Sequence, residues 1–213
     1  MSEKIYNHKK NFYLVKNPSM NLVKINFFFA VLMMGLASVA STPGVAQSED
    51  LWGTLKSGNH IVLIRHALAP GYSDPKNFDL KDCQTQRNLN EEGRLQSKKI
   101  GNLFRSKGIA QAAVFSSQWC RCRDTARLLN LGEVSELPAL NSFFENFERR
   151  SSQTDQLREW IKATSLKTPT ILISHQVNIA ALTGYSPSSG EIVFLRRELD
   201  GTLQVIGSIS TLQ

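Results

Sequence analysis

The chain has 213 residues, of which 41% are hydrophobic and 20% charged, a composition that is ordinary for a globular domain and excludes a disordered one. Its formal net charge of +7 at first suggests a nucleic-acid partner. Residues 1–46 carry five lysines and one acid, however, so removing their +4 from +7 leaves +3, without a dense basic run. A mildly basic body suits a small anionic ligand as well as a polymer, so the charge alone decides little. The expectation of a small ligand and no nucleic-acid partner comes from the motifs described below.

An apolar segment near the N-terminus indicates a targeting signal. Residues 25–40 form an uncharged apolar run of 16 residues that directly follows Lys24. This length suits the core of a signal peptide and falls short of the roughly 20 residues that a membrane span needs. Small residues then provide cleavage sites after Ala40 or after Ala46.

This segment sets the expected domain organisation. We expect a signal peptide over residues 1–46 and one domain over residues 47–213. The polar region before the apolar run is long for a signal peptide, and Met20 would give a start of conventional length. The alternative is an uncleaved N-terminal anchor. In either case we expect the domain to be periplasmic or secreted, and after cleavage we expect no stable membrane insertion.

Hydrophobic periodicity beyond the leader alternates between strands and helices. Short apolar or alternating runs predict strands at 60–64, 112–116, 134–137 and 170–174 and a hairpin at 191–196 and 202–208. Periodic and capped segments predict helices between Asn90 and Gly108 and over 119–129, 156–163 and 176–184. Residues 69–86 are rich in Pro, Gly, Asp and Asn and predict a loop. This alternation predicts an α/β fold, a three-layer α/β/α sandwich with a mainly parallel central sheet.

Three cysteines follow the leader, and an oxidising compartment favours a disulfide between two of them. Cys120 and Cys122 lie two apart on a predicted helix and point to different faces, so they are poor partners for each other. We expect Cys83 to pair with Cys120 or with Cys122. The C-x-C motif of Cys120 and Cys122 has no cluster of His or acidic residues beside it, so we expect no metal site.

Reactive side chains follow three of the predicted strands. Arg65 and His66 come after the first strand, Ser116 and Ser117 end the second, and His175 comes directly after the strand at 170–174. Ligands of such sheets bind beyond the carboxyl ends of the strands. We therefore expect the two histidines to meet in one site.

Four motifs resemble those of the histidine phosphatase superfamily, which includes phosphoglycerate mutases and phosphohistidine phosphatases. They are Leu63-Ile-Arg65-His66-Ala67, Leu89-Asn-Glu-Glu-Gly93-Arg-Leu-Gln96, Ser116-Ser117-x-x-x-Arg121-x-x-x-Thr125-Ala126 and Ile171-Leu-Ile-Ser174-His175. Their order and spacing over about residues 61–182 are those of the family's mutase-like branch, here with the leader of an exported, proteobacterial-type member. Ala67 stands where the family usually has glycine.

The chemistry of these residues is coherent in its own right. A neutral imidazole is a good nucleophile toward phosphorus, so we expect His66 to form a phosphohistidine. Arg65 and Arg121 present planar, permanently charged forks to the equatorial oxygens of the phosphoryl group. The resemblance implies the same roles, with His175 as the fourth member of the phosphate pocket. It also implies that no metal or cofactor is required.

A leaving alcohol needs a proton, and mutase-like relatives supply it from a glutamate between the pocket arginine and the second histidine. Glu145 is the candidate, because its apolar neighbours are expected to raise its pKa. Glu136 and Glu148 are its competitors.

Selectivity is expected to come from residues around the rim. The predicted substrate-binding residues are Arg87, Asn88, Tyr72 and Gln176. Arg87 is either a second anion contact or a member of a structural ion pair.

The sequence thus predicts an exported, metal-independent phosphatase that hydrolyses a small phosphomonoester through a phosphohistidine on His66. The alternatives are a non-catalytic phosphate-binding module of the same fold and a phosphohistidine-protein phosphatase. The sequence specifies neither the natural substrate nor the oligomeric state.

Overall fold

The computed structural model describes residues 50–212. The predicted signal peptide over 1–46 and the predicted start at Met20 lie outside these residues. Residues 46–213 form one unit by their contacts. Within the described range, no helix is both long enough and apolar enough to cross a membrane.

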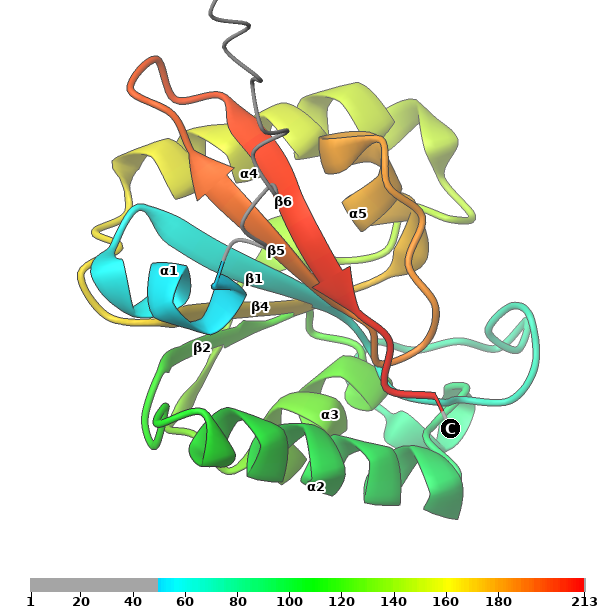
Figure 1. Cartoon of the computed structure of the whole chain (residues 1–213). Coiled ribbons are helices and arrows are strands. Elements are labelled where there is room, and N and C mark those ends of the chain that lie inside the picture. The colour runs from blue at the N-terminus through cyan, green and yellow to red at the C-terminus, as the bar shows by residue number, and fades with distance from the viewer. Residues whose placement is uncertain (1–49, 213) are drawn as a thin grey trace, which may run out of the picture. The chain divides into compact units, whose positions relative to one another are not determined.

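Six strands form the sheet at the centre of the domain (Figure 1). They are β1 (His60–Arg65), β2 (Ala113–Ser116), β3 (Val134–Glu136), β4 (Thr170–Ser174), β5 (Ile192–Arg197) and β6 (Leu203–Ile209). Their order across the sheet is β3-β2-β4-β1-β5-β6. The pairs β3–β2, β2–β4 and β4–β1 are parallel, whereas β5 and β6 add an antiparallel edge.

Over residues 50–212, five helices and three short 3-10 turns accompany the sheet. The helices are α1 (Leu51–Ser57), α2 (Glu91–Ser106), α3 (Cys120–Leu129), α4 (Arg150–Ala163) and α5 (Gln176–Thr183). The turns are η1 (Cys83–Thr85), η2 (Pro138–Leu140) and η3 (Phe147–Arg149). Asn90 caps α2 through a hydrogen bond from the backbone N–H of Gly93, as its position before two glutamates predicts.

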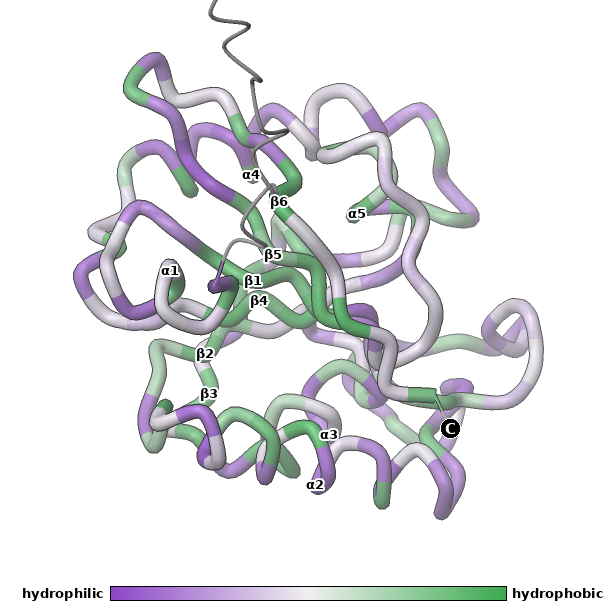
Figure 2. The backbone as a smooth tube through the Cα atoms, viewed as in Figure 1, coloured by the Kyte–Doolittle hydropathy of each residue, from purple (hydrophilic) through white to green (hydrophobic). Residues whose placement is uncertain are grey.

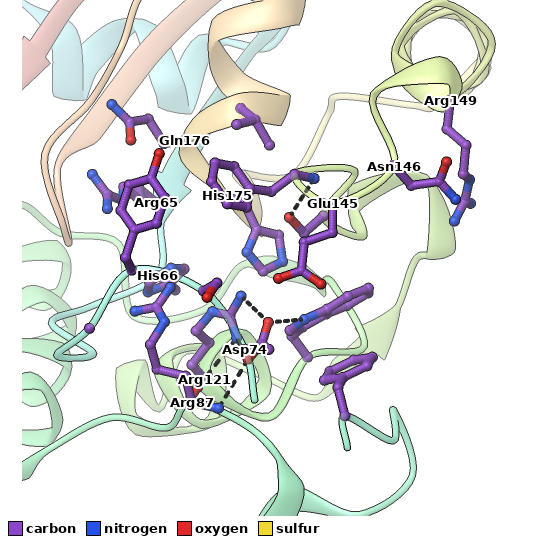
Figure 3. Close-up of a pocket in the computed structure, with 18 residues that line it drawn as sticks. Arg65, His66, Asp74, Arg87, Arg121, Glu145, Asn146, Arg149, His175 and Gln176 are labelled. Atoms are coloured by element: carbon purple, nitrogen blue, oxygen red, sulfur yellow. Dashed lines mark hydrogen bonds and ion pairs between the residues drawn. The ribbon is translucent and has the colours of Figure 1, made fainter. Parts of the chain in front are cut away.

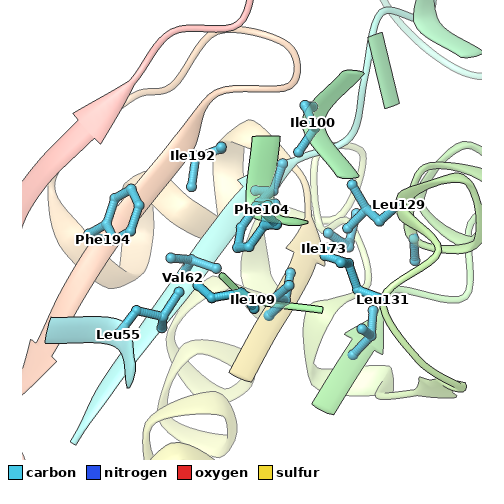
Figure 4. Packing of buried hydrophobic residues seen from close by; sticks show 14 of the residues in the cluster. Leu55, Val62, Ile100, Phe104, Ile109, Leu129, Leu131, Ile173, Ile192 and Phe194 are labelled. Atoms are coloured by element: carbon cyan, nitrogen blue, oxygen red, sulfur yellow. The ribbon is translucent and has the colours of Figure 1, made fainter. Parts of the chain in front are cut away.

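Alternation along the central strands separates two hydrophobic cores, one on each face of the sheet. Val62 and Ile64 of β1 pack with α1, α2 and α3, where Phe104 is fully buried (Figure 4). Ile61 and Leu63 face the other way and pack with α4 and α5. In Figure 2 the hydrophobic residues accordingly concentrate along β1, β4 and β5, while hydrophilic residues lie mostly on the helices and loops around them. The predicted three-layer sandwich and mainly parallel sheet are confirmed.

Two helices differ from the sequence prediction. Helix α1 was not predicted, because its seven residues contain one fully buried side chain, Leu55, and show no amphipathic repeat. Helix α4 was predicted over 156–163 but begins at Arg150. Its first turns bury the polar Gln153 and Thr154, so they lack the apolar spacing by which a helix is recognised.

The disulfide joins Cys83 to Cys120, with 5.7 Å between their Cα atoms. This settles the choice that the sequence left open, and it leaves Cys122 as a buried free thiol. The bond fastens the loop over residues 69–86 to the first residue of α3, directly before Arg121.

Candidate active site

The two candidate histidines lie side by side because their strands are neighbours in parallel register. Arg65 of β1 stands opposite Ser174 of β4, and the backbone N–H of His66 donates to the carbonyl of Ser174 at 2.9 Å. The backbone N–H of Ser117, directly after β2, donates to the carbonyl of Ile173. The rings of His66 and His175 consequently lie 5.5 Å apart, centroid to centroid. The two histidines thus lie in one site, as the sequence predicts.

One nitrogen of His66 is held by the main chain. Its Nδ1 lies 2.8 Å from the carbonyl oxygen of Ala67. A carbonyl oxygen can only accept a hydrogen bond, so Nδ1 carries the proton and Nε2 carries the free lone pair. The fixed tautomer therefore makes Nε2 the nucleophilic atom of this ring.

The turn after His66 is held by residues of two other motifs. The backbone N–H of Ala67 donates to Oγ1 of Thr125, and that of Leu68 donates to Oε1 of Gln96. Helix α2 reaches this turn only because Gly93 has no side chain, since a Cβ there would lie 2.0 Å from the carbonyl oxygen of Leu68. The α2 and α3 motifs thus set the position of the main-chain carbonyl that fixes His66.

His175 is positioned by a buried polar network. Its Nε2 lies 2.9 Å from Oγ of Ser117, which in turn donates to Oδ1 of Asn141. The carbonyl of Asn141 accepts hydrogen bonds from Gln153 in α4 and Asn178 in α5. The structure buries Asn178 in this network. Asn141 was missed because a single buried asparagine leaves no periodic signal.

Three arginines gather beside the two histidines. Arg65, Arg87 and Arg121 all line the same pocket (Figure 3). Burial and the neighbouring charge of Arg121 lower the pKa of Arg65, and the same two causes lower that of Arg87 to about 10. Both side chains remain cationic at neutral pH, so the pocket is strongly electropositive.

Asp74 lies inside this cluster and was missed as a partner of its arginines. Its carboxylate accepts hydrogen bonds from both Nη atoms of Arg121, at 2.8 and 3.1 Å, and from the indole N–H of Trp119. Burial alone would raise the pKa of Asp74, but the hydrogen bonds and charge of Arg121 outweigh it and lower that pKa. The available signal was an acid in the loop after His66, since such a loop must lie at the site.

The pocket extends outward from the histidines as a cavity of about 260 Å³. Aromatic side chains of three segments line it, namely Tyr72 and Phe78 of the loop, Trp119 before α3, and Phe144. Phe78 stacks on Trp119, and Tyr72 meets Phe144 edge to face. Tyr72 is 82% exposed, so it stands at the mouth of the cavity.

The predicted rim residues have different outcomes. Arg87, Tyr72 and Gln176 line the cavity, and Gln176 donates to Oγ of Ser186. Asn88 does not line it; its amide N–H groups donate to the carbonyls of Cys83 and Gln86 and hold the loop. Asn88 is therefore not a rim residue, because its amide is taken up by these two loop carbonyls.

The acid candidates also separate in space. Glu145 lines the cavity, but its side chain is exposed and not buried among its apolar neighbours. Glu136 pairs instead with Arg123, at 3.4 Å, away from the cavity lining. Glu148 is likewise outside the lining.

Metal-ligating side chains do not gather in the described part of the chain, where no group of three His, Cys, Asp or Glu residues has suitable geometry. Cys122 lies 3.4 Å from Nε2 of His175. Burial raises the pKa of its thiol to about 12, so it is protonated and unreactive at neutral pH.

The geometry agrees with a match over the centre of the chain. Residues 61–184, more than half of the sequence, match the model of the histidine phosphatase superfamily (branch 1). The chain belongs to the histidine phosphatase superfamily. All four motifs lie within the matched residues.

A match to an individual relative covers a smaller part of the chain. The serine/threonine-protein phosphatase Pgam5 of Drosophila virilis, a mitochondrial protein, is 34% identical over 74 residues, which are 35% of this chain and 23% of the relative. The chain thus spans less than a quarter of the length of that relative.

Solved structures support the fold. The protein histidine phosphatase SixA complexed with tungstate has a TM-score of 0.54 and 17% identity, covering 71% of this chain and 97% of SixA. A mycobacterial glucosyl-3-phosphoglycerate phosphatase complexed with VO3 has a TM-score of 0.53 and 15% identity, over 69% of this chain and 96% of that protein.

The protonation of this histidine phosphatase gives a test of the site. Burial first, and then the charge of Arg121, lowers the pKa of both His66 and His175 well below 6.5. We expect their ring proton resonances in NMR spectra to stay at the neutral position between about pH 8 and 6. Resonances that titrate with a midpoint near 6.5 would contradict the buried, electropositive pocket.

The same shifts have a consequence for stability. Unfolded histidines take up protons below about pH 6.5 while the buried ones do not, so the free energy of unfolding falls as the pH drops below that value. Each histidine adds at most about 1.4 kcal/mol per pH unit to this slope. In the His66→Gln and His175→Gln variants, the free energy of unfolding measured with urea is therefore expected to fall less steeply as the pH drops.

Proposed function

We propose that this histidine phosphatase hydrolyses a small phosphomonoester through a phosphohistidine on Nε2 of His66. The observation that carries the proposal is the hydrogen bond from Nδ1 of His66 to the carbonyl of Ala67, because it presents Nε2 as a free lone pair. The low pKa of His66 keeps that lone pair available at neutral and mildly acidic pH. A phosphate-binding module without catalysis would not need a free lone pair on Nε2 of His66.

The first chemical step forms the His66 Nε2–phosphorus bond and breaks the bond between phosphorus and the ester oxygen. Negative charge spreads over the three equatorial oxygens of the transferring group, so positioning and electrostatic stabilisation dominate the barrier. Arg65, Arg121 and Arg87 supply that stabilisation from fixed positions in the pocket wall. His175, neutral and held by Ser117, adds a polar contact beside the reacting atoms.

In the first step we assign Glu145 as the proton donor to the departing ester oxygen, because it lines the cavity outside the two histidines. In the second step a water oxygen forms a bond to phosphorus while the His66 Nε2–phosphorus bond breaks. The carboxylate of Glu145 takes a proton from the water that attacks phosphorus, which releases inorganic phosphate and neutral His66. The exchange of one proton in each direction balances the cycle.

The outer cavity supports a preference among substrates. Tyr72, Phe78, Trp119 and Phe144 present aromatic surface to whatever part of the substrate lies beyond the phosphate. Flat or apolar leaving groups bury well against such surfaces. We propose a small phosphorylated molecule with a ring as the substrate class, rather than a polymer.

Replacing His66 tests the central claim. We expect His66→Ala to lower kcat toward p-nitrophenyl phosphate by more than about 1,000-fold, because no other group lies in its place. His60→Ala is the matched control, since His60 lies outside the pocket lining. Excess EDTA is expected to leave the wild-type rate unchanged. Equal rates for His66→Ala and wild type, or wild-type binding of phosphate without turnover, would reject the proposal.

Replacing Glu145 tests the proton donor. A nitrophenolate leaves without help, whereas an alkoxide needs a proton, so Glu145→Gln is expected to slow an alkyl phosphomonoester by about 100-fold or more. The loss with p-nitrophenyl phosphate is expected to be several-fold only. Glu148→Gln, on the same segment but outside the cavity lining, serves as the control. An equal loss with both substrates would exclude Glu145 as the donor.

We propose further that the enzyme acts outside the cytoplasm. The uncharged run over residues 25–40 and the small residues after it support export, and the Cys83–Cys120 disulfide suits an oxidising compartment. Expression of the full chain is expected to yield a periplasmic or secreted protein whose N-terminus lies after Ala40 or Ala46. Recovery of the intact N-terminus in the cytoplasm would exclude export.

A further inference from the structure

We propose that Asp74 is a positioning residue, which holds one edge of the Arg121 guanidinium and thereby turns the other edge toward the phosphoryl group. The inference rests on the proposed function and assigns a role to the carboxylate that pairs with Arg121, one of the three arginines beside the two histidines. Two observations support it: the hydrogen bonds that Arg121 makes, and the disulfide and stacked ring that fasten the loop carrying Asp74 next to Arg121.

The ion pair between Asp74 and Arg121 is built rather than incidental. Their side chains are only 12% and 4% exposed, and the carboxylate grips both Nη atoms as a two-pronged pair. Oδ2 of Asp74 also accepts the indole N–H of Trp119, and Oδ1 accepts the backbone N–H of Arg87. Four donors around one carboxylate fix its orientation, which a surface ion pair does not achieve.

The hydrogen-bond donors of Arg121 show which edge of its guanidinium remains free to bind a ligand. Of its two Nη1 hydrogens, one goes to Asp74 and the other to the backbone carbonyl of Arg87. One Nη2 hydrogen goes to Asp74. The second Nη2 hydrogen and the Nε–H therefore remain, and they point the same way along the side edge of the guanidinium. The Nε atom is buried without a hydrogen-bond partner among the described residues.

The two neighbouring arginines follow a similar pattern. Nη1 of Arg65 donates to the carbonyl of Pro187, and Nη1 of Arg87 donates to that of Ala69. Their Nε atoms are also buried without partners among the described residues. A buried donor left unpaired is destabilising, so such a donor favours binding of an acceptor. Three such donors on one pocket wall suit the three equatorial oxygens of a transferring phosphoryl group.

The charge balance supports the same role. Asp74 offsets one of the three arginine charges, so the inner pocket keeps two positive charges, which match a phosphomonoester dianion. The low pKa of Asp74 keeps it ionised at neutral pH. An ionised carboxylate orients Arg121 but has no proton to give, so this role differs from that of Glu145.

The loop that carries Asp74 is attached to two neighbouring residues directly before Arg121. The disulfide ties Cys83 of the loop to Cys120, and the stacked ring of Phe78 lies on Trp119. Asp74 and Arg121 are therefore held by one structure in fixed register, and Asp74 does not need to leave when phosphate binds.

The experiment compares Asp74→Asn with wild type on two substrates, p-nitrophenyl phosphate and glycerol phosphate. Because misplacing a catalytic contact by about 1 Å costs roughly 100-fold, we expect kcat to fall about 10- to 100-fold by the same factor on both substrates. We expect vanadate inhibition to weaken by a similar factor, and phosphate inhibition to change less than about three-fold. Asp82→Asn, an exposed aspartate of the same loop, is the matched control and is expected to retain full activity.

A double-mutant cycle tests whether Asp74 acts through Arg121. In an Arg121→Ala background, Asp74→Asn is expected to cause no further loss, because the side chain it positions is absent. Circular dichroism of each variant establishes that it is folded. If Asp74→Asn costs as much in that background as in wild type, Asp74 does not act through Arg121 and the inference is wrong.

Two other outcomes also overturn it. A rise in kcat/KM with phosphate binding tightened more than about ten-fold would make Asp74 a competitor for the phosphate position. A loss confined to glycerol phosphate would make it the proton donor instead. Failure of the proposed function is separable, since it appears as absent turnover in wild type. Asp74 is then judged by calorimetric binding of vanadate to the folded variants, where an unchanged affinity in Asp74→Asn counts against it.

Discussion

Parallel pairing of β1, β4 and β2 is the constraint on which the rest of the site depends. With Arg65 opposite Ser174 and the N–H of Ser117 on the carbonyl of Ile173, three strands end at one level of the sheet. The residues that follow them have little freedom, because the strands beneath are buried on both faces. A slip of one residue in β1 would turn His66 away from His175, so the packing of the two cores also fixes the chemistry.

The same burial shapes the electrostatics. Desolvation and nearby arginines keep both histidines neutral, which a nucleophilic imidazole needs, while each guanidinium resists deprotonation. Like charges in a half-buried pocket repel one another, and Asp74 relieves part of that repulsion through Arg121. The pocket thus combines a neutral nucleophile with a wall of net positive charge, and that charge helps to keep the histidines neutral.

Support for the site comes from several parts of the fold. Thr125 and Gln96 hold the turn after His66, and Asn141 links Ser117 to α4 and α5. The disulfide fastens the loop that supplies Tyr72 and Phe78 to the aromatic rim. Residues far from phosphorus therefore set the direction of the few atoms that contact it, as preorganised stabilisation of a transition state requires.

The sequence by itself determined the fold class, the positions of most strands and the meeting of His66 with His175. These follow from local rules, since apolar runs define buried strands and parallel strands place their carboxyl ends together. The family match over residues 61–184 agrees with the four motifs.

Only the tertiary structure decided the partner of Cys83, the exposure of Glu145, the displacement of Asn88 from the cavity and the pairing of Asp74 with Arg121. Asp74 and Arg121 lie 47 residues apart in the chain, and the loop between the first strand and α2 has no hydrophobic period to fix its course. The path of such a loop is set by its contacts with the finished domain, among them a disulfide, a stacked ring and a buried ion pair. These contacts exist only after the strands and helices have assembled.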